Sequence, residues 1–305
     1  MCLVEPTWNL EANAYVVRIA AEYRLAALEW LRQRYRSHWT GRDLRILEQC
    51  SMPYISYLLT QEGISPPEVV YRGAVAEANG FSVDGLQMVG NTPVWVESYR
   101  LGEPKLRNYR LQFGEIVGNE EKGGFLSGRS LLESLNPLWG TLARNILGCF
   151  ICYKGAPAGF SGSTPMAFGA VFFSSWPERD LDWSELLVHE TLHAVLHILR
   201  CYGPFMLNEE EVGYSDFREE SRPLLGIFHS MAALRLIEDL HQAYLDGSPL
   251  DCGASENQYL RNVQNMRAGC QEALKCAKWT KLGESVWEWI LSSGRRYAAL
   301  RDVLI

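Results

Sequence analysis

The chain has 305 residues, of which 47% are hydrophobic and 21% are charged, and its formal net charge is −7. This size and composition are ordinary for a globular protein with a sizeable core, and the ten Trp, 14 Tyr and 11 Phe exclude an intrinsically disordered chain. The acidic balance excludes sequence-independent nucleic-acid binding, which depends on neutralising phosphates, so we expect no nucleic acid among the partners.

No stretch reaches the roughly 18 uninterrupted apolar residues of a membrane-spanning helix, and residues 1–10 lack the basic flank and apolar run of a secretory signal. We therefore expect no membrane association and a cytoplasmic protein with reduced thiols. Cys149 and Cys152 form a CxxC inside an apolar run, but no second pair follows at zinc-ribbon spacing. The cysteines are interpreted as core residues.

The first half of the chain predicts helices followed by a less regular segment. Apolar residues recur at helical spacing over residues 11–36, and shorter helices are predicted over 42–50 and 66–78. Residues 80–128 contain Gly, Pro and charges between short runs, which predicts strands or extended loops. Helical periodicity returns over 131–148, where Pro137 interrupts it. Strands are predicted over 149–153 and 168–173, with a Gly- and Ser-rich loop between them.

The second half predicts mainly helices. One covers 182–201 and ends before Gly203-Pro204, and a polar loop follows over 208–220. Ser221 is the expected N-cap of a helix reaching Leu245, with Pro223 in its first turn. Helices are also expected over 254–278 and 283–304. The predicted fold is α+β and mainly α-helical, with helices packed around a small β-sheet. We expect residues 1–125 to form a mixed region and 126–305 a metal-binding core, within one continuous globular unit.

The chemistry-bearing motif is His189-Glu190-Thr191-Leu192-His193, an HExxH sequence on the helix predicted over 182–201. A spacing of four places both imidazoles on one helix face, so they can share a metal ion. Apolar neighbours predict that this helix is buried in the core, where a His pair is costly unless it is paired or metallated. The alternative is a pair of hydrogen-bonded core histidines.

Two histidines need a third ligand from a later segment. His197 lies two turns beyond His189, about 12 Å along the helix, so we expect it in the core or beside a ligand rather than on the metal. The remaining candidates are His229, Glu209, Glu210, Glu211, Glu238 and Asp239. Arg222 precedes His229 by seven residues, two turns on one helix face, and its guanidinium could hold the far carboxylate of an organic acid. Its alternative role is a surface salt bridge with Glu219 or Glu220.

Beyond HExxH, the chain contains Tyr214-Ser-Asp-Phe-Arg218 and then Arg222-Pro-Leu-Leu-Gly-Ile-Phe-His229. Over residues 149–245 this combination resembles the 2-oxoglutarate-dependent HExxH-type peptide β-hydroxylases, the HExxH-motif peptide-modification proteins encoded in gene clusters for ribosomally made, post-translationally modified peptides. The Arg-Pro-Leu segment is more specific than HExxH alone. Phe217 stands where that family often has Trp, and Ser230 where it often has Gly.

The resemblance implies that His189, His193 and His229 bind Fe(II), and that Arg222 or Arg218 pairs with the distal carboxylate of 2-oxoglutarate. Glu190 is the candidate catalytic residue of the motif, although this chemistry gives it no obligatory acid–base role, so it would orient a ligand. The implied reaction is hydroxylation of the β-carbon of a residue in a precursor peptide, which a leader segment could help to deliver. Residues 1–125 are a candidate surface for that peptide.

Two other functions remain open at this stage. In a zinc metallopeptidase, Glu190 would be the general base, and one of Glu209 to Glu211 or Glu238 would be the third ligand. The extended HExxHxxGxxH arrangement of many such enzymes is absent, because residues 196 and 199 are both Leu. A non-catalytic peptide-binding protein with a degenerate site is the third possibility, which the intact His-Glu-His set disfavours.

Overall fold

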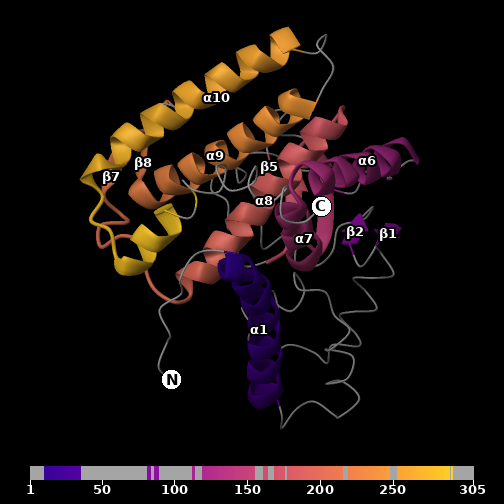
Figure 1. The fold of residues 1–305 in the computed structure, drawn as a ribbon. Coiled ribbons are helices and arrows are strands. Elements are labelled where there is room, and N and C mark those ends of the chain that lie inside the picture. The colour runs from indigo at the N-terminus through magenta and orange to yellow at the C-terminus, as the bar shows by residue number, and fades with distance from the viewer. Residues whose placement is uncertain are drawn as a thin grey trace. The chain divides into compact units, whose positions relative to one another are not determined.

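The protein is described here by a computed structural model (Figure 1). It describes residues 10–35, 81–83, 86–88, 112–113, 119–154, 161–163, 168–175, 177–215, 219–247, 253–288 and 290. The described part is mainly helical with two small sheets, which agrees with the predicted α+β class. None of its helices is both long and apolar enough to cross a lipid bilayer.

The named helices are α1 (Leu10–Tyr35), α6 (Asn119–Leu135), α7 (Pro137–Ile146), α8 (Asp180–Arg200), α9 (Leu224–Gly247), α10 (Gly253–Ala273) and the short 3-10 helix η4 (Leu274–Cys276). The strands are β1 (Phe81–Val83), β2 (Leu86–Met88), β3 (Gln112–Phe113), β4 (Cys149–Lys154), β5 (Ser161–Gly162), β6 (Ala170–Phe173), β7 (Val212–Ser215) and β8 (Glu220–Pro223). Residues 281–288 are also helical.

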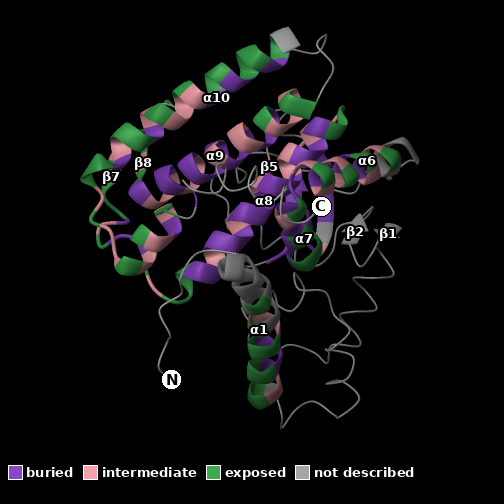
Figure 2. Ribbon diagram, in the orientation of Figure 1, coloured by how far each residue is buried: buried purple, intermediate pink, exposed green. Residues whose placement is uncertain are grey.

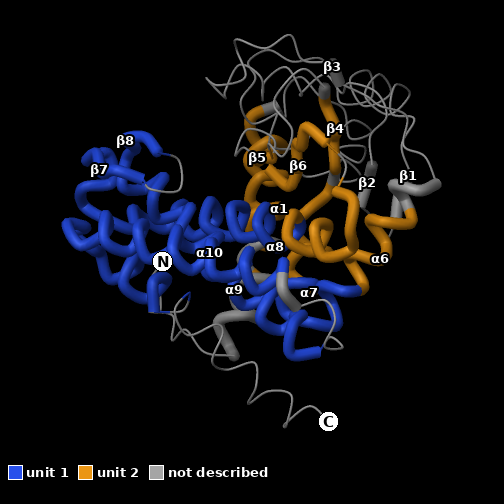
Figure 3. Tube along the Cα trace, turned by 90° about the horizontal axis from the view of Figure 1, so that it is seen from above, with its two compact units in different colours: residues 1–16, 131–140, 187–305 blue, residues 17–130, 141–186 orange. Residues whose placement is uncertain are grey.

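The described residues fall into two compact units, shown in different colours in Figure 3. Unit 1 comprises residues 1–16, 131–140 and 187–305, and unit 2 comprises residues 17–130 and 141–186. The predicted division near residue 125 stays a prediction, because most of residues 36–118 lies outside the described part. The helices expected over 42–50 and 66–78 and the strand expected over 92–97 lie outside it as well.

Unit 2 contains a sheet with the strand order β1-β2-β4-β6-β5, and β3 pairs with β4 off this path. The central strands β4 and β6 run parallel, with Phe150 opposite Val171, and every residue of β6 is buried. Continuous apolar runs are typical of parallel strands covered on both faces. Cys152 in β4 and Cys270 in α10 are buried, as expected for core cysteines. Cys201 and Cys276 are exposed, so the core interpretation is wrong for these two.

The first turns of α8 pack tightly against α6 within unit 2. The fully buried Trp183 meets Phe125 edge to face, with ring centroids 5.6 Å apart. A Cβ built on Gly128 would lie 2.2 Å from the Cβ of Trp183 and 2.8 Å from the carbonyl oxygen of Asp180. The hydroxyl of Ser184 donates to the Gly128 carbonyl at 2.7 Å. Glycine therefore allows the two helices to approach closely.

This packing corrects one prediction. Residues 119–128, expected to be strand or loop, form the first half of α6. Glycines in a helix interior lower its intrinsic stability, so three of them suggested a loop. Two of them, Gly124 and Gly128, instead face Trp183, and tertiary packing overrides the local preference. The predicted interruption at Pro137 is confirmed, because α7 begins there and Asn136 Oδ1 caps it by accepting the Trp139 amide at 3.1 Å.

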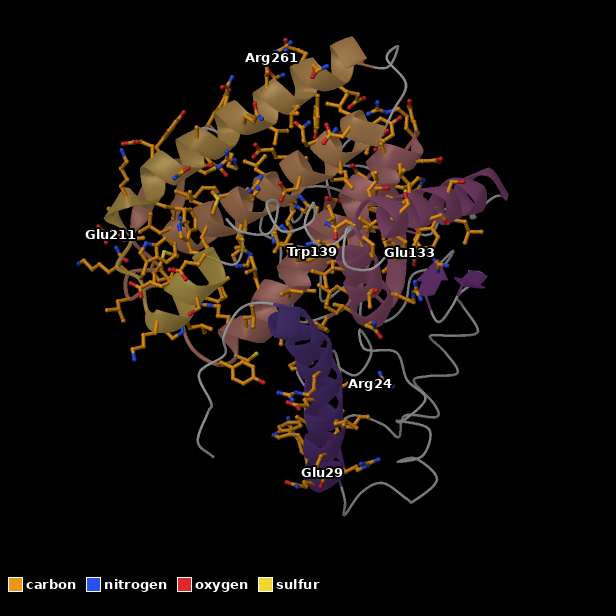
Figure 4. The ribbon with its side chains drawn as sticks, viewed as in Figure 1. Arg24, Glu29, Glu133, Trp139, Glu211 and Arg261 are labelled. Atoms are coloured by element: carbon orange, nitrogen blue, oxygen red, sulfur yellow. The ribbon has the colours of Figure 1, made fainter. Side chains whose placement is uncertain are left out.

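Unit 1 contains α9, α10, the β7–β8 hairpin and residues 187–200 of α8. Helix α10 lies along α9, and Figure 2 shows α9 largely buried while α10 exposes one side (Figures 1 and 2). The buried positions of α10 include Glu256, Leu260 and Val263, whereas Arg261 projects away from α9 in Figure 4. Between the helices, Arg267 Nε lies 2.6 Å from Glu238 Oε2.

A second correction concerns the start of α9. The helix was expected to be capped by Ser221, but it begins at Leu224, and residues 220–223 form strand β8. The predicted polar loop over 208–220 likewise contains β7, which pairs antiparallel with β8, with Gly213 opposite Arg222. Proline fixes its own backbone but does not distinguish a helix start from a strand end. Arg222 is therefore a strand residue.

Candidate metal centre

Two helices of unit 1 bring four histidines together. Helix α8 carries His189, His193 and His197 at intervals of four residues, and α9 carries His229. The ring centroids of His189 and His193 are 4.6 Å apart, and those of His193 and His229 are 5.4 Å apart. His197 lies beside His229 at 5.7 Å. The rings of the three proposed metal ligands thus lie next to one another.

The ring nitrogens form a chain that has His193 at its centre. His193 Nε2 lies 3.0 Å from His189 Nε2, and His193 Nδ1 lies 3.2 Å from His229 Nδ1. Nitrogens on adjacent octahedral positions of an ion, at bonds of about 2.1 Å, are separated by about 3.0 Å. The separation of the first pair therefore fits a shared metal ion, and it equally fits a hydrogen bond between the two histidines, the alternative left open by the sequence.

The third histidine fits less directly. One ion cannot bind both nitrogens of the His193 ring, so a three-nitrogen site requires at least one of the rings to rotate. Accordingly, the described residues contain no group of three His, Cys, Asp or Glu side chains already arranged to hold a metal. The structure brings the predicted imidazoles together but does not aim all three at one point.

His229, like the three histidines of α8, is half-buried as a residue. Its Nε2 atom is buried and has no hydrogen-bond partner among the described residues. Burial, followed by the charges of neighbouring groups that include Arg200 and Arg222, lowers the pKa of His229 to about 3. Burial and then Arg200 lower the pKa of His197 to about 4. Both imidazoles are therefore neutral at physiological pH, the form that binds metals.

Glu190, the candidate catalytic residue, is fully buried on α8. Its Oε1 atom lies 3.9 Å from His189 Nε2, the nitrogen that also faces His193. This separation is too long for a hydrogen bond, so the contact is electrostatic. The structure thus places a buried carboxyl group beside the histidine pair.

Arg222 reaches the same region from β8. A Cβ built on Gly226 would lie 3.8 Å from the guanidinium carbon of Arg222, so the guanidinium lies over Gly226, one turn before His229. Its Nε atom is 3.5 Å from Glu220 Oε1, the salt bridge considered as its alternative role. Arg218, the other candidate for the 2-oxoglutarate carboxylate, lies outside the described residues.

The acidic candidates for a third ligand have other partners. Glu209 Oε2 accepts from Arg200 at 2.9 Å, and its Oε1 accepts the Phe205 amide at 2.7 Å. Glu238 is paired with Arg235 and Arg267. Asp239 is also paired with Arg235, at 2.6 Å, while Glu211 accepts from Asn208. Glu210 is exposed. None of these contacts involves a histidine.

Arg200 is the feature that sequence analysis missed. It follows His193 by seven residues and His197 by three, so it continues the histidine face of α8. That spacing was a usable signal, but a charged residue near a helix end is usually solvated. No protein-family model matches this chain, and no curated protein matches it either. The family resemblance therefore rests on the motifs themselves.

Proposed function

We propose that the protein is an Fe(II)- and 2-oxoglutarate-dependent dioxygenase that hydroxylates the β-carbon of a residue in a ribosomally synthesised peptide. The observation that carries this proposal is the meeting of His189, His193 and His229 from two helices, with the Arg222 guanidinium one turn from His229. Three neutral nitrogen ligands on one side of an ion leave other positions open for a co-substrate. We assign the reaction to the cytoplasm, where reduced iron is available.

Each residue has a distinct task in this proposal. His189, His193 and His229 would hold the metal, and Glu190 would orient His189 and offset the charge of the ion. The planar guanidinium of Arg222 suits paired hydrogen bonds to the far carboxylate of 2-oxoglutarate, and Arg218 is the second candidate. When bound, iron and 2-oxoglutarate would, together with O2, supply the oxidation that converts C–H to C–OH. This oxidation releases succinate and CO2.

Two properties of this chain suit such chemistry. Burial keeps His229 and His197 neutral well below pH 7, so a ligand nitrogen remains available. Helices rather than loops carry the three imidazoles, which favours a fixed geometry. The peptide substrate, with or without a leader, would approach from a surface for which residues 1–125 remain our candidate.

A zinc metallopeptidase is the competing function, because HExxH with a buried Glu190 is compatible with it. That function needs a third ligand, and the acidic candidates are poorly suited to provide one. Glu209 and Glu238 would each have to leave arginine partners that hold them away from the histidines. Their existing ion pairs support the hydroxylase proposal over the peptidase.

The decisive experiment requires no known peptide. Purified protein is loaded with Fe(II) and 2-oxoglutarate without oxygen, and we expect a weak visible charge-transfer band. Admitting O2 should then release succinate slowly even without substrate. Arg222→Met should weaken 2-oxoglutarate binding, whereas Arg179→Met should not, because Arg179 is exposed, is paired with Asp182 and lies just before α8. If neither the band nor succinate appears, the hydroxylase proposal is wrong.

Candidate precursor peptides then separate the two enzyme classes by mass. A hydroxylase leaves the peptide intact with one added oxygen, and a peptidase gives two fragments. Glu190→Gln should abolish cleavage in a peptidase, because the general base is lost, while a hydroxylase keeps part of its turnover. Zinc should inhibit a hydroxylase and support a peptidase.

A further inference from the structure

One ion pair joins the end of α8 to the turn that precedes β7. Arg200, the last residue of α8, donates to Glu209 Oε2 through Nη2 at 2.9 Å and through Nε at 3.2 Å. The Arg200 side chain is half-exposed, but Glu209 is buried, with 8% of its surface exposed. A buried carboxylate is retained only where its partners are well placed.

The Glu209 carboxylate is also connected to the neighbour of His229, through Phe205. Glu209 Oε1 accepts the backbone amide of Phe205 at 2.7 Å. The Phe205 ring is fully buried and lies against the Phe228 ring, with centroids 5.2 Å apart. Phe228 immediately precedes His229. Glu209 thus fixes the aromatic residue on which the neighbour of His229 rests.

The turn also fixes the start of α9 through its backbone. The Leu224 amide donates to the Glu211 carbonyl at 2.8 Å, and the Leu225 amide donates to the Glu209 carbonyl at 3.1 Å. These amides belong to the first turn of α9, where a helix has no internal acceptors for its N–H groups. The carbonyls of the turn therefore dock the helix end, and His229 follows five residues after Leu224.

We propose that Arg200 and Glu209 are positioning residues that set the placement of His229 against His193. The pair links α8, which carries His193, to the turn before β7. That turn holds α9, which carries His229, through two backbone hydrogen bonds and the contact between Phe205 and Phe228. This inference deepens the proposed function and rests on it for the role of His229 as a metal ligand.

A second ion-pair cluster in unit 1, partly buried and centred on Glu238, provides the control. Glu238 also has partners on two helices, Arg235 of α9 and Arg267 of α10. It lies nine residues beyond His229 on α9, and its contacts with Arg235, Arg267 and Gln264 are all to α9 and α10. Glu238→Ala therefore removes a comparable partly buried carboxylate without disturbing the proposed connection.

The test compares Glu209→Ala, Arg200→Met and Glu238→Ala, using the full chain. Co(II) affinity is measured by titration of its visible absorption, and metal-free protein labelled with ¹⁵N-histidine reports the ring nitrogens of the six histidines by NMR. We expect Glu209→Ala and Arg200→Met to weaken Co(II) binding at least tenfold and to shift the ring signals of His193 and His229. Glu238→Ala should change the Co(II) affinity by less than twofold and leave the ring signals of His193 and His229 in place. Arg200→Lys should retain most of the Co(II) affinity that Arg200→Met loses.

Two results would overturn the inference. One is unchanged His193 and His229 signals in folded Arg200→Met, and the other is an equal loss of Co(II) affinity in Glu238→Ala. Arg200→Met keeps the Glu209 contact with Phe205, so it serves if Glu209→Ala does not fold. If wild-type protein binds no Co(II) or Fe(II), the proposed function fails, whereas the metal-free NMR comparison still decides whether the pair positions His229.

Discussion

His193 has hydrogen-bonding contacts through both ring nitrogens, and this links its tautomer to those of His189 and His229. A neutral imidazole donates through one nitrogen and accepts through the other. If His193 donated to His229, the buried Nε2 of His229 would carry an unsatisfied N–H, which is rare and costs about 1–3 kcal/mol. The opposite arrangement leaves a lone pair on that nitrogen. The hydrogen-bond chain thus favours a lone pair on His229 Nε2 and a proton on His193 Nε2, and a metal bound at the His189–His193 pair would have to displace that proton.

Removal of individual histidines should therefore have unequal effects on metal binding. We expect His229→Ala to weaken Co(II) or Fe(II) binding by roughly a hundredfold or more, since a ligand is lost. His197→Ala should weaken it by about tenfold at most, because His197 contacts His229 without being needed on the ion. Competition with a metallochromic indicator measures both constants. A larger loss in His197→Ala than in His229→Ala would contradict this assignment of ligands.

The depressed pKa values predict an acid-sensitive metal-free protein. His229 and His197 have pKa values of about 3 and about 4 when folded, below the usual 6.5. Between these folded pKa values and pH 6.5, the unfolded chain binds protons that the folded chain does not. The free energy of unfolding therefore falls as the pH drops below 6.5. Each histidine contributes up to roughly 3 kcal/mol between pH 6.5 and 4.

Urea unfolding of metal-free protein between pH 7.5 and 4.5 measures this loss. In His197→Gln the unfolding free energy should vary less with pH than in wild type, because glutamine does not titrate. This difference in slope should be smaller at pH 7 than at pH 5. Glu238→Gln, which changes an ion pair away from the histidines, should leave the contribution of His197 intact. An unfolding free energy in His197→Gln that varies with pH as in wild type would contradict the prediction.

At the scale of elements, the sequence was most informative where one period extends over many residues. Helices α1 and α8 and strands β4 and β6 lie where the apolar patterns predicted them. The predictions failed at α6, where glycines face Trp183, and at β8, where Ser221 and Pro223 suggested a helix start. At α6 a contact distant in sequence, with Trp183, decides the local structure, whereas at β8 pairing with the neighbouring strand β7 does so. The meeting of α8 with α9 at His229 was expected from the motif resemblance, because spacing alone left several ligands open.

The glycines of α6 provide a direct test of this explanation. We expect Gly128→Ala to destabilise the protein by about 1–3 kcal/mol, because its Cβ would overlap Trp183 and the Asp180 carbonyl oxygen. Gly123→Ala lies in the same helix with nothing within 4 Å of the added Cβ, and should stabilise it by up to about 1 kcal/mol. Thermal and urea unfolding measure both effects. Similar changes in the two variants would show that packing does not explain Gly128.

At the scale of the whole molecule, the proposed site is contained within one unit. His189, His193, His197, His229, Arg200 and Arg222 all belong to unit 1, whereas the sheet around β4 and β6 belongs to unit 2. Helix α8 begins in unit 2 with Trp183 and carries its histidines in unit 1. The part of α8 that is packed against α6 is thus different from the part that carries the chemistry.

Metal binding should therefore protect some elements more than others from hydrogen exchange. A ligand present at 100 times its Kd stabilises the bound state by about 2.7 kcal/mol, so amides that exchange only after the site opens should slow by roughly a hundredfold. We expect this slowing in residues 187–200 of α8 and in the first half of α9, which supply the histidines. Strands β4 and β6 contain no proposed ligand and should change far less. Mass spectrometry of exchanged peptides, with and without Co(II), measures the pattern, and His229→Ala should abolish it. Equal protection of β6 and α9 would mean that the metal binds elsewhere or stabilises the chain only as a whole.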